Sequence, residues 1–349
     1  MQKKLIALAV AGLVSGGAFA QSNVTVYGII DAGYVHDSGN AAGSASRLSS
    51  GVNNGSRLGF KGTEDLGNGL KTNFTAETGF CADSNAGAPA FCTGGNNFMG
   101  RQAWVNLSGN FGTVQAGRQY VPGFTMVLAP MDPFGAGTAG QMENLTTAGV
   151  GYGNPRANNV VTYVTPTVSG FTGVAAYVFG ETTGSTSKSS GYTLAGGYGN
   201  GPLALGASYL SLNDTAGNSG GANKNTNFGA TYDLGMVKLR GIFQTVKMAP
   251  LGVVATDASD WMLGLTAPMG GGVGSYLAAS YVNHNDKRAA NQDASQVGVG
   301  YYYGLSKRTT VYTVYAKMNR KNGNLMTVGN ATDAGTGDSA FNLGVTHAF

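Results

Sequence analysis

The sequence predicts an all-β fold, a 16-stranded antiparallel transmembrane β-barrel, and three observations lead to that class. The last nine residues alternate and end on an aromatic side chain, with Phe341, Leu343, Val345, His347 and Phe349 on one strand face. Charged residues are only 11% of the chain, while glycine accounts for 58 of its 349 residues. Short turn clusters also alternate strictly with longer polar segments. Strands with one lipid-facing side and one water-facing side, joined in this way, are typical of outer-membrane barrels.

The N-terminus predicts a secretory signal peptide over residues 1–20. Two lysines precede an apolar stretch, Leu5 to Val14, and Ala18-Phe19-Ala20 has the small-residue pattern of a cleavage site. The mature barrel would then comprise residues 21–349. Removing two lysines and no acid lowers the net charge of +4 by two, so the charge balance gives no indication of nucleic acid as a partner. No later apolar run reaches about 18 residues, so we expect no membrane helix.

The number of strands follows from the turns. Seven short clusters rich in glycine, asparagine, proline and aspartate predict tight hairpins. They lie at Asp65 to Gly69, Gly109 to Gly112, Pro166 to Gly170, Gly199 to Pro202, Asp233 to Gly235, Ala267 to Gly272 and Ser306 to Arg308. The longer polar segments lie near residues 36–55, 81–100, 121–155, 180–191, 211–226, 247–260, 283–295 and 318–339.

Seven hairpins join fourteen strands, and one further strand at each end gives the predicted sixteen. An even number closes the barrel and places both termini at the end with the short turns, which is the periplasmic end. A barrel of this size encloses a water-filled channel and not a packed core. One segment breaks the pattern, because Ala103, Val105 and Leu107 share the strand phase of Arg101. We therefore expect a loop to cover the lumen wall there.

The sequence offers little for catalysis or metal binding. His36 and His284 fall on predicted external loops, and His347 falls on an outward strand position. No spacing of histidine and cysteine supports a metal site, and a hydrolase would need a nucleophile beside one of these histidines. We therefore expect no enzyme activity, no metal and no cofactor.

Several blocks of the chain resemble a known family. They are Val24 to Gly33, Ser56 to Leu70, Phe111 to Gln119, Arg156 to Tyr163, and Gly344 to Phe349. Together they resemble the Gram-negative trimeric porins of the β-proteobacterial branch, and the likeness covers nearly all of the mature chain. The block from Arg57 to Leu70 is the most specific part.

The resemblance implies a homotrimer in the outer membrane, in contact with its lipid and lipopolysaccharide, that passes small hydrophilic solutes and anions. It also implies that the third external loop folds inward to narrow the channel. By strand order this loop is Val121 to Pro155, and its Asp132-Pro133-Phe134-Gly135 resembles the acidic-Phe-Gly element of such loops.

Three arginines occupy matching heights on alternate strands of the predicted barrel. Arg57 and Arg101 each stand eight residues before a turn, and Arg156 stands ten before one. Since neighbouring strands are about 4.8 Å apart, their side chains can reach a common zone of the lumen. Lys61 has the same phase as Arg57 at a lower level, and Glu77 lies on the strand between Arg57 and Arg101.

We expect this set to give a moderate preference for anions, partly offset by Glu77 and Asp132. The resemblance agrees, because the family lines one side of its constriction with basic residues. A plainer reading is that these are ordinary solvated charges of the lumen. Arg118 shares its phase with Val114 and Ala116, so we expect it at a strand end or a subunit contact.

Two further features bear on assembly. Cys81 and Cys92 flank the external loop after the third strand, and two cysteines in a secreted chain predict a disulfide; two free thiols are the alternative. Phe349 would lie on the lipid face and act as an assembly signal. The function that the sequence favours is a general-diffusion porin. A substrate-selective channel for small organic anions, or a barrel acting mainly as a surface adhesin or structural anchor, are the alternatives.

Overall fold

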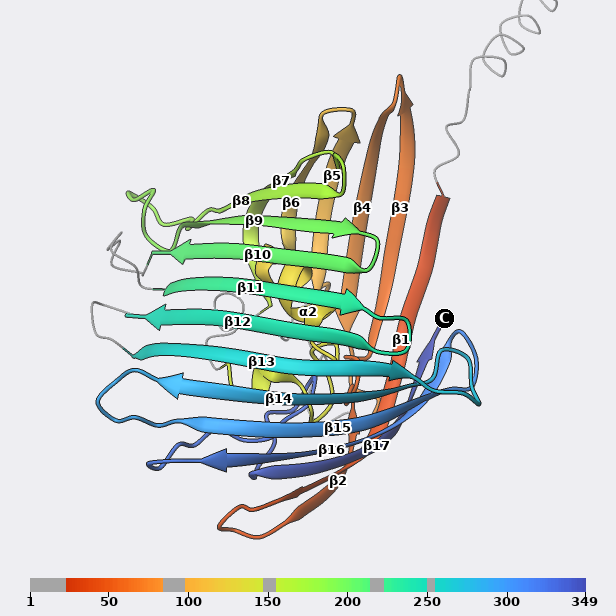
Figure 1. Ribbon diagram of the computed structural model, residues 1–349. Helices are drawn as coiled ribbons and strands as arrows, with labels where there is room; N and C mark the ends of the chain where they lie inside the picture. Colours follow the sequence, from red (N-terminus) through yellow and green to blue (C-terminus); the bar gives the residue numbers. More distant parts are fainter. Residues whose placement is uncertain (1–22, 84–97, 147–154, 214–222, 250–254) are drawn as a thin grey trace, which may run out of the picture.

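The chain forms a closed antiparallel barrel, seen from the side in the computed structural model of Figure 1. The structure describes residues 23–83, 98–146, 155–213, 223–249 and 255–349. The predicted signal peptide, residues 1–20, lies outside these ranges. Closure comes from the first and last strands, which pair from Ile29 with Ala348 to Ser38 with Ser339.

Seventeen strand segments build the sixteen positions of the barrel. Their bounds are β1 (Asn23–Ser38), β2 (Ala45–Ser50), β3 (Arg57–Gly67), β4 (Leu70–Gly79), β5 (Gln102–Gly109), β6 (Gly112–Tyr120), β7 (Arg156–Val164), β8 (Phe171–Val178), β9 (Gly191–Asn200), β10 (Leu203–Leu212), β11 (Asn223–Asp233), β12 (Lys238–Met248), β13 (Thr256–Pro268), β14 (Tyr276–Asp286), β15 (Ala294–Gly304), β16 (Thr309–Arg320) and β17 (Ser339–Ala348). Because β2 and β3 both pair with β1, they are two halves of one strand. The predicted 16-stranded barrel is therefore confirmed.

The interruption of the second strand, residues 51–56, differs from the single long loop expected at 36–55. The first strand continues to Ser38 and the second begins at Ala45. Around the break, side chains replace ladder hydrogen bonds: the Asp31 carboxylate accepts the Asn53 N–H, and the Ser56 hydroxyl accepts the Asp31 N–H. Gly51 has a φ of 70°, which turns the chain out of the ladder.

The seven tight turns lie where the sequence places them. The first is representative: β3 and β4 are joined by Asn68 and Gly69, whose φ values are 52° and 79°. Positive φ at both central residues is the geometry of a type I′ hairpin, which matches the twist of the flanking strands. The long connections lie at the opposite ends of the strands.

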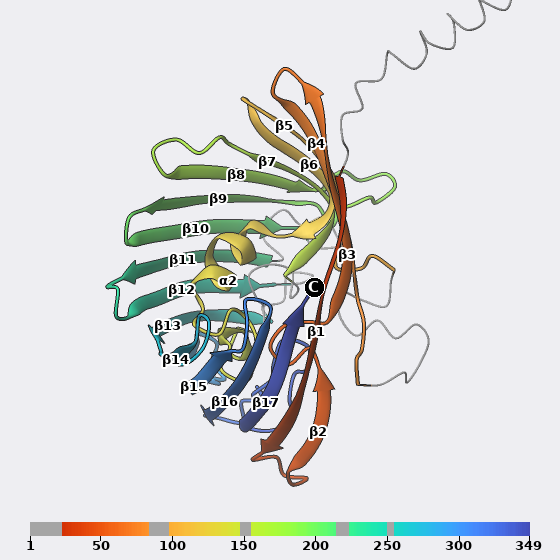
Figure 2. The ribbon, with the colours of Figure 1, turned by 90° about the vertical axis from the view of Figure 1, so that its right-hand side faces the viewer.

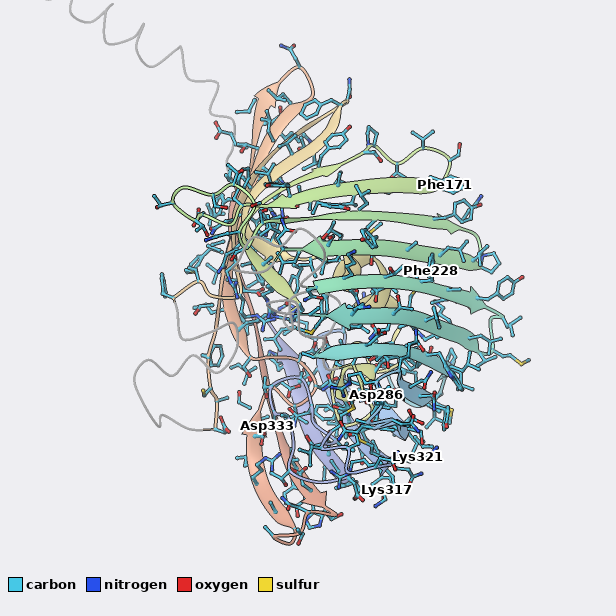
Figure 3. The ribbon with its side chains drawn as sticks, turned by 90° about the vertical axis from the view of Figure 1, so that its left-hand side faces the viewer. Phe171, Phe228, Asp286, Lys317, Lys321 and Asp333 are labelled. Atoms are coloured by element: carbon cyan, nitrogen blue, oxygen red, sulfur yellow. The ribbon has the colours of Figure 1, made fainter. Side chains whose placement is uncertain are left out.

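Side chains alternate across the barrel wall. On β11, Asn225 and Asn227 face inward and are almost fully buried, whereas Phe228 is 54% exposed on the outer surface. In Figure 3, Phe171 and Phe228 lie well away from the labelled charged residues Asp286, Lys317, Lys321 and Asp333. Those charges lie at or beyond strand ends joined by long connections, where Lys317 pairs with Asp338 at 2.8 Å. An apolar outer band with a charged rim suits a lipid bilayer.

The described part of the connection between β6 and β7 lies inside the barrel. It holds a π-helical turn η1 (Phe124–Leu128), a short helix α2 (Ala129–Met131) and a 3₁₀ turn η2 (Met142–Asn144). Figure 2 shows α2 on the inner side of the curved sheet. Val127, Leu128 and Phe134 are buried against the wall. In the described ranges no helix is long and apolar enough to cross a membrane.

One expectation from strand phase and the placement of two histidines on loops are wrong. Ala103, Val105 and Leu107 are exposed on the outer face of β5, so no loop covers them. Arg101 precedes the first residue of β5, and its side chain turns inward even though alternation groups it with these three. His284 is not on a loop, because β14 continues to Asp286 and buries it beside Asp260, with Nδ1 and Oδ1 2.5 Å apart. His36 likewise lies within β1.

Candidate pore constriction

A cavity of about 1180 Å³ separates the wall formed by β1 and β3 to β7 from the inward-folded loop. We name residues 121–146 loop 3. The wall side of the cavity carries Tyr27, Arg57, Lys61, Glu77, Arg101, Tyr120 and Arg156. The loop side carries Phe124, Thr125, Ala129, Pro130, Gly135, Ala136 and Glu143. Five of the six predicted pore residues thus line one passage: Arg57, Lys61, Glu77, Arg101 and Arg156.

Glu77 is the centre of the wall cluster. Its Oε1 accepts a hydrogen bond from Arg101 Nε at 2.8 Å, and its Oε2 lies 3.9 Å from Arg57 Nε. The Tyr27 hydroxyl donates to Oε2 at 3.0 Å. Glu77 and Arg101 are both almost fully buried, and such an ion pair needs each partner, since removing either leaves an uncompensated charge.

Tyr120 joins two arginines and was missed from the sequence. Its hydroxyl accepts a hydrogen bond from Arg101 Nη2 at 2.9 Å and another from Arg156 Nη2. The Arg156 guanidinium also lies 4.3 Å from the centroid of the Tyr120 ring, within the range of a cation–π contact. One neutral side chain therefore fixes the positions of two positive charges.

Simple alternation hides Tyr120. On β6 it groups Tyr120 with Val114, which is exposed on the outer face. Tyr120 is the last residue of β6 and pairs with Arg156, the first residue of β7. The pairing shifts register just before this point, since Gly117 pairs with Val160 but Gln119 with Ala157, which places the extra residue on β7. Regular alternation therefore fails at these two strand ends, and both Tyr120 and Arg156 line the cavity.

The lower part of the cluster is less enclosed. Lys61 is exposed, and its Nζ lies 5.2 Å from the centroid of the Tyr27 ring. Arg57 is half-buried. These two side chains are therefore the cations of the cluster most open to water.

Asp132 is not part of this cluster, contrary to the expectation that it offsets the arginines from the loop. It is only 2% exposed, and its carboxylate accepts the backbone N–H groups of Phe134 at 2.9 Å, Ala136 at 3.2 Å and Met142 at 3.1 Å. Burial raises its pKa to about 6 despite these bonds. It lines a separate cavity of about 550 Å³ beside Arg240. The hydrogen bonds of Asp132 hold loop 3 in its folded shape.

Glu143 is the acidic loop residue that faces the arginines. It lies in η2, is half-buried and lines the large cavity with Arg101 and Arg156. Burial raises the pKa of its carboxyl to about 7, the Asp132 charge adds to this, and Arg156 opposes it. No short motif marks Glu143, so only its place in the segment 121–155 could have suggested it.

The last long connection closes over loop 3. The Gln141 side chain donates to the Asn330 carbonyl at 2.9 Å, and the Gly329 N–H donates to Asn144 Oδ1 at 3.0 Å. The Ala331 N–H donates to the Val52 carbonyl at 3.3 Å. Residues 329–331 therefore tie loop 3 to the interruption of the second strand, a contact that no sequence pattern indicates.

Of the remaining predicted residues, Phe349 lies at the edge of the cavity, Arg118 and Cys81 do not line it, and Cys92 lies outside the described ranges. Arg118 donates to the Gly100 carbonyl at 2.5 Å and to Asn158 Oδ1 at 2.6 Å, and it does not line the cavity. Phe349 is 45% exposed, and its ring lies over Gly28. Cys81 follows β4. Cys92 lies outside the described residues, so the Cys81–Cys92 disulfide stays a prediction.

A closed barrel with an apolar outer band and a charged passage through it defines a class, the pore-forming proteins of the bacterial outer membrane. The chain matches the Gram-negative porin family over residues 7–323. It belongs to that family.

Individual relatives agree with this assignment. The chain is 35% identical to outer membrane porin protein 32 of Delftia acidovorans, with all of both chains covered. It is 31% identical to an outer membrane porin of Bordetella pertussis, over 91% of this chain and 94% of that protein. Among solved structures, an anion-selective porin from Comamonas acidovorans matches with a TM-score of 0.78 at 33% identity, covering 94% of this chain and all of that one.

The protein is therefore an outer-membrane channel and not an enzyme. It forms a water-filled pore for the passive diffusion of small hydrophilic solutes, as the sequence predicts. The sixteen strand positions make it a multi-pass protein of the outer membrane, and the β-proteobacterial resemblance is confirmed by the Delftia and Bordetella relatives.

Proposed function

We propose that this porin prefers anions and that Arg57, Arg101 and Arg156, with Lys61, set the preference. The observation that carries the proposal is the charge of the passage. Among the described residues that line it, four are cationic and two, Glu77 and Glu143, are acidic. The match to an anion-selective porin supports the same conclusion.

The magnitude is sufficient for a moderate preference. A unit charge about 6 Å away in water contributes roughly 0.7 kcal/mol, which is about a threefold change in local ion concentration. Two uncompensated cations in a passage with low-dielectric walls can therefore favour anions by about an order of magnitude. The effect weakens as salt rises, since the Debye length is about 8 Å at physiological ionic strength.

Reversal potentials in a salt gradient test the proposal. Neutralising Arg57 and Arg156 with glutamine, singly and together, should lower the anion preference stepwise. Adding Arg101→Gln should bring the channel close to non-selectivity or to cation preference. Glu77→Gln should raise the anion preference, because it removes the carboxylate nearest to two arginines.

Arg118→Gln is the matched control, since it removes one arginine that does not line the passage. Its reversal potential should stay near that of the wild type. If the triple arginine variant keeps the wild-type potential, the selectivity proposal is wrong, although the channel itself remains.

A second candidate is a channel selective for small aromatic or other organic anions. Tyr120 and Phe124 stack with ring centroids 4.9 Å apart and planes at 10°, directly beside Arg156. A flat apolar surface next to a guanidinium suits a planar carboxylate. Benzoate should then reduce chloride current at millimolar concentration, whereas acetate should not; equal effects of the two anions would exclude this candidate.

We also propose a homotrimer that contacts outer-membrane lipid and, at the charged external rim, lipopolysaccharide. Exposed apolar side chains such as Val24 and Val26 on β1 and Val105 on β5 give the wall surfaces that can face lipid or another subunit. Detergent extracts should contain a heat-sensitive trimer with conductance steps in groups of three. A channel-active monomer in light scattering would contradict the trimer.

A further inference from the structure

The wall opposite the arginines carries glycines at the places where loop 3 touches it. Those that face the lumen include Gly206 on β10, Gly229 on β11, Gly264 on β13 and Gly300 on β15. None has a positive φ, so the backbone at these positions would accept any residue. Glycine in a strand interior weakens the strand, and it often marks a site where another backbone approaches closely. Glycine is present here because a larger residue would lack room for its side chain.

Loop 3 occupies the space at Gly206, Gly229 and Gly264 and contributes to the contacts at Gly300. A Cβ on Gly206 would lie 2.3 Å from the Met126 carbonyl oxygen, and one on Gly229 would lie 2.1 Å from Met131 Sδ. A Cβ on Gly264 would lie 2.4 Å from Pro133 Cγ. A Cβ on Gly300 would lie 2.7 Å from Val314 Cγ2 on the wall and 3.2 Å from the Phe134 ring. The backbone of η1 and the side chains of α2 and its C-terminal extension thus rest directly on the main chain of the wall.

Polar anchors hold the end of the loop on the same wall. The Ala139 N–H donates to Asn342 Oδ1 at 2.7 Å, and Thr138 hydrogen-bonds to the Tyr302 hydroxyl at 3.0 Å. Arg240 Nη1 donates to the Pro130 carbonyl at 2.7 Å. These bonds fix the loop along the wall, whereas the glycines determine how close to the wall it lies.

The distance between loop and wall determines the width of the passage. The arginine cavity is bounded on one side by loop 3 and on the other by β1 and β3 to β7. Any movement of the loop away from β10 to β15 is therefore a movement toward the arginines. Carbon atoms in contact are normally about 3.5–4.0 Å apart, so a methyl group at Gly206 would require the loop backbone to shift by roughly 1 Å or more.

We propose that Gly206, Gly229, Gly264 and Gly300 are positioning residues that set the pore width by letting loop 3 lie flush against the wall. These glycines act only through the space they leave, because they have no charged side chain. The proposal rests on the passage beside the arginines being the conducting path, but it does not depend on which ion the passage prefers.

Single-channel conductance of alanine variants tests the proposal, with uptake rates of sugars of increasing size as a second measurement. Gly206→Ala should lose part of the wild-type conductance and admit large sugars more slowly, because the clash is with backbone and no side chain can move to relieve it. Gly229→Ala should do the same, because its Cβ meets Met131. Both variants should keep the sign of the wild-type reversal potential.

A rescue experiment separates displacement of the loop from general damage. Met131→Ala removes the sulfur that the Gly229 methyl group meets most closely and leaves the contact with Val127 Cγ1 at 2.9 Å. Gly229→Ala/Met131→Ala should therefore recover part of the conductance lost in Gly229→Ala. Gly241→Ala is the control for adding a methyl group to the wall away from loop 3. Gly241 on β12 shares the outward phase of Leu239 and Phe243, and the atom nearest to its Cβ would be 3.7 Å away. Its conductance should equal that of the wild type.

Three results would overturn the proposal: wild-type conductance in folded Gly206→Ala and Gly229→Ala, no recovery in the double variant, or an equal loss in Gly241→Ala. If Gly206→Ala does not assemble, the comparison of Gly229→Ala with its double variant decides the matter alone. Conductance of the glycine variants tests the role of the wall glycines, and reversal potential of the arginine variants tests anion preference. Failure of one proposal is therefore distinguishable from failure of the other.

Discussion

At the scale of residues, neutral side chains organise the charges of the passage. Tyr27 and Tyr120 contribute hydroxyl groups that hold Glu77, Arg101 and Arg156 in place. Hydrogen bonds to charged groups are worth more than those between neutral groups, so these tyrosines restrict where the guanidinium groups can lie. A field that selects ions depends on such fixed positions as well as on the number of charges.

Tyr120→Phe should therefore weaken anion preference without changing any charge. The variant loses the acceptor shared by Arg101 and Arg156 but keeps the ring beneath Arg156. We expect the reversal potential to shift toward zero by less than in Arg156→Gln. Phe124→Leu, which alters the neighbouring ring and none of these hydrogen bonds, is the control. An unchanged potential in Tyr120→Phe would show that the hydroxyl is not needed to position the arginines.

Glu143 should make ion preference depend on pH. Its carboxyl has a pKa raised to about 7, so it is ionised above that pH and neutral below it. Lowering the pH through 7 removes a negative charge that faces the arginines, and anion preference should rise. Reversal potentials measured at pH values below and above this pKa would show the change. In Glu143→Gln the reversal potential should stay at the wild-type acid value over the whole pH range. A pH dependence that persists in Glu143→Gln would assign the titration to another group.

At the scale of elements, loop 3 has its own fold. Three backbone N–H groups converge on the Asp132 carboxylate, and buried Val127, Leu128 and Phe134 attach the segment to the wall. The loop is therefore a packed element in its own right. Its shape depends on local hydrogen bonds, and its position depends on the wall.

Asp132→Asn should loosen loop 3 and leave the barrel intact. An amide nitrogen cannot accept a hydrogen bond, so at least one of the three N–H groups loses its acceptor, at a cost of about 1–3 kcal/mol. We expect noisier single-channel current with an unchanged heat-modifiable barrel in gels. Asp65→Asn is the control, because Asp65 is exposed in a turn and uses one oxygen to accept the Gly67 N–H. Quiet, wild-type current from Asp132→Asn would contradict this account of the loop.

At the scale of the whole molecule, the barrel closes where its two ends meet. Phe349 exchanges two backbone hydrogen bonds with Gly28, at 3.0 and 3.1 Å, and its ring occupies the space that a Cβ on Gly28 would need. The Asp31 carboxylate also accepts hydrogen bonds from Thr346 and from Tyr312, which joins β1 to β17 and β16. Closure therefore depends on residues from both ends of the chain.

Removing Phe349, or replacing it with aspartate, should impair assembly more than it alters any channel that does form. The side chain is uncharged, so the charge of the passage does not depend on it. The amount of heat-modifiable barrel in outer-membrane fractions measures assembly, and Phe349→Tyr should assemble normally because it keeps the ring. Normal assembly of the chain without Phe349 would rule out its role as a signal.

The sequence by itself determined the barrel, the number of strand positions and the seven turns, and it pointed to five residues that the structure brings together in one cavity. These features follow from local rules: a period of two along each strand, turn residues that accept positive φ, and polar side chains on the water-facing side. Arg57 and Glu77 obey that period, so their heights above the turns were enough to bring them together.

Only the tertiary structure showed which residues depart from the two-residue period of the strands and which distant segments come into contact. Tyr120 faces the cavity from the end of β6 against its strand phase, Arg101 turns inward just before β5 begins, and His284 lies on a strand that continues into the expected loop. Asp132 and Glu143 are acids of the same loop, yet one folds it and the other faces the arginines. Loop 3 has no repeating pattern, and its side chains are placed by the wall against which they pack, which is formed by residues far away in the chain.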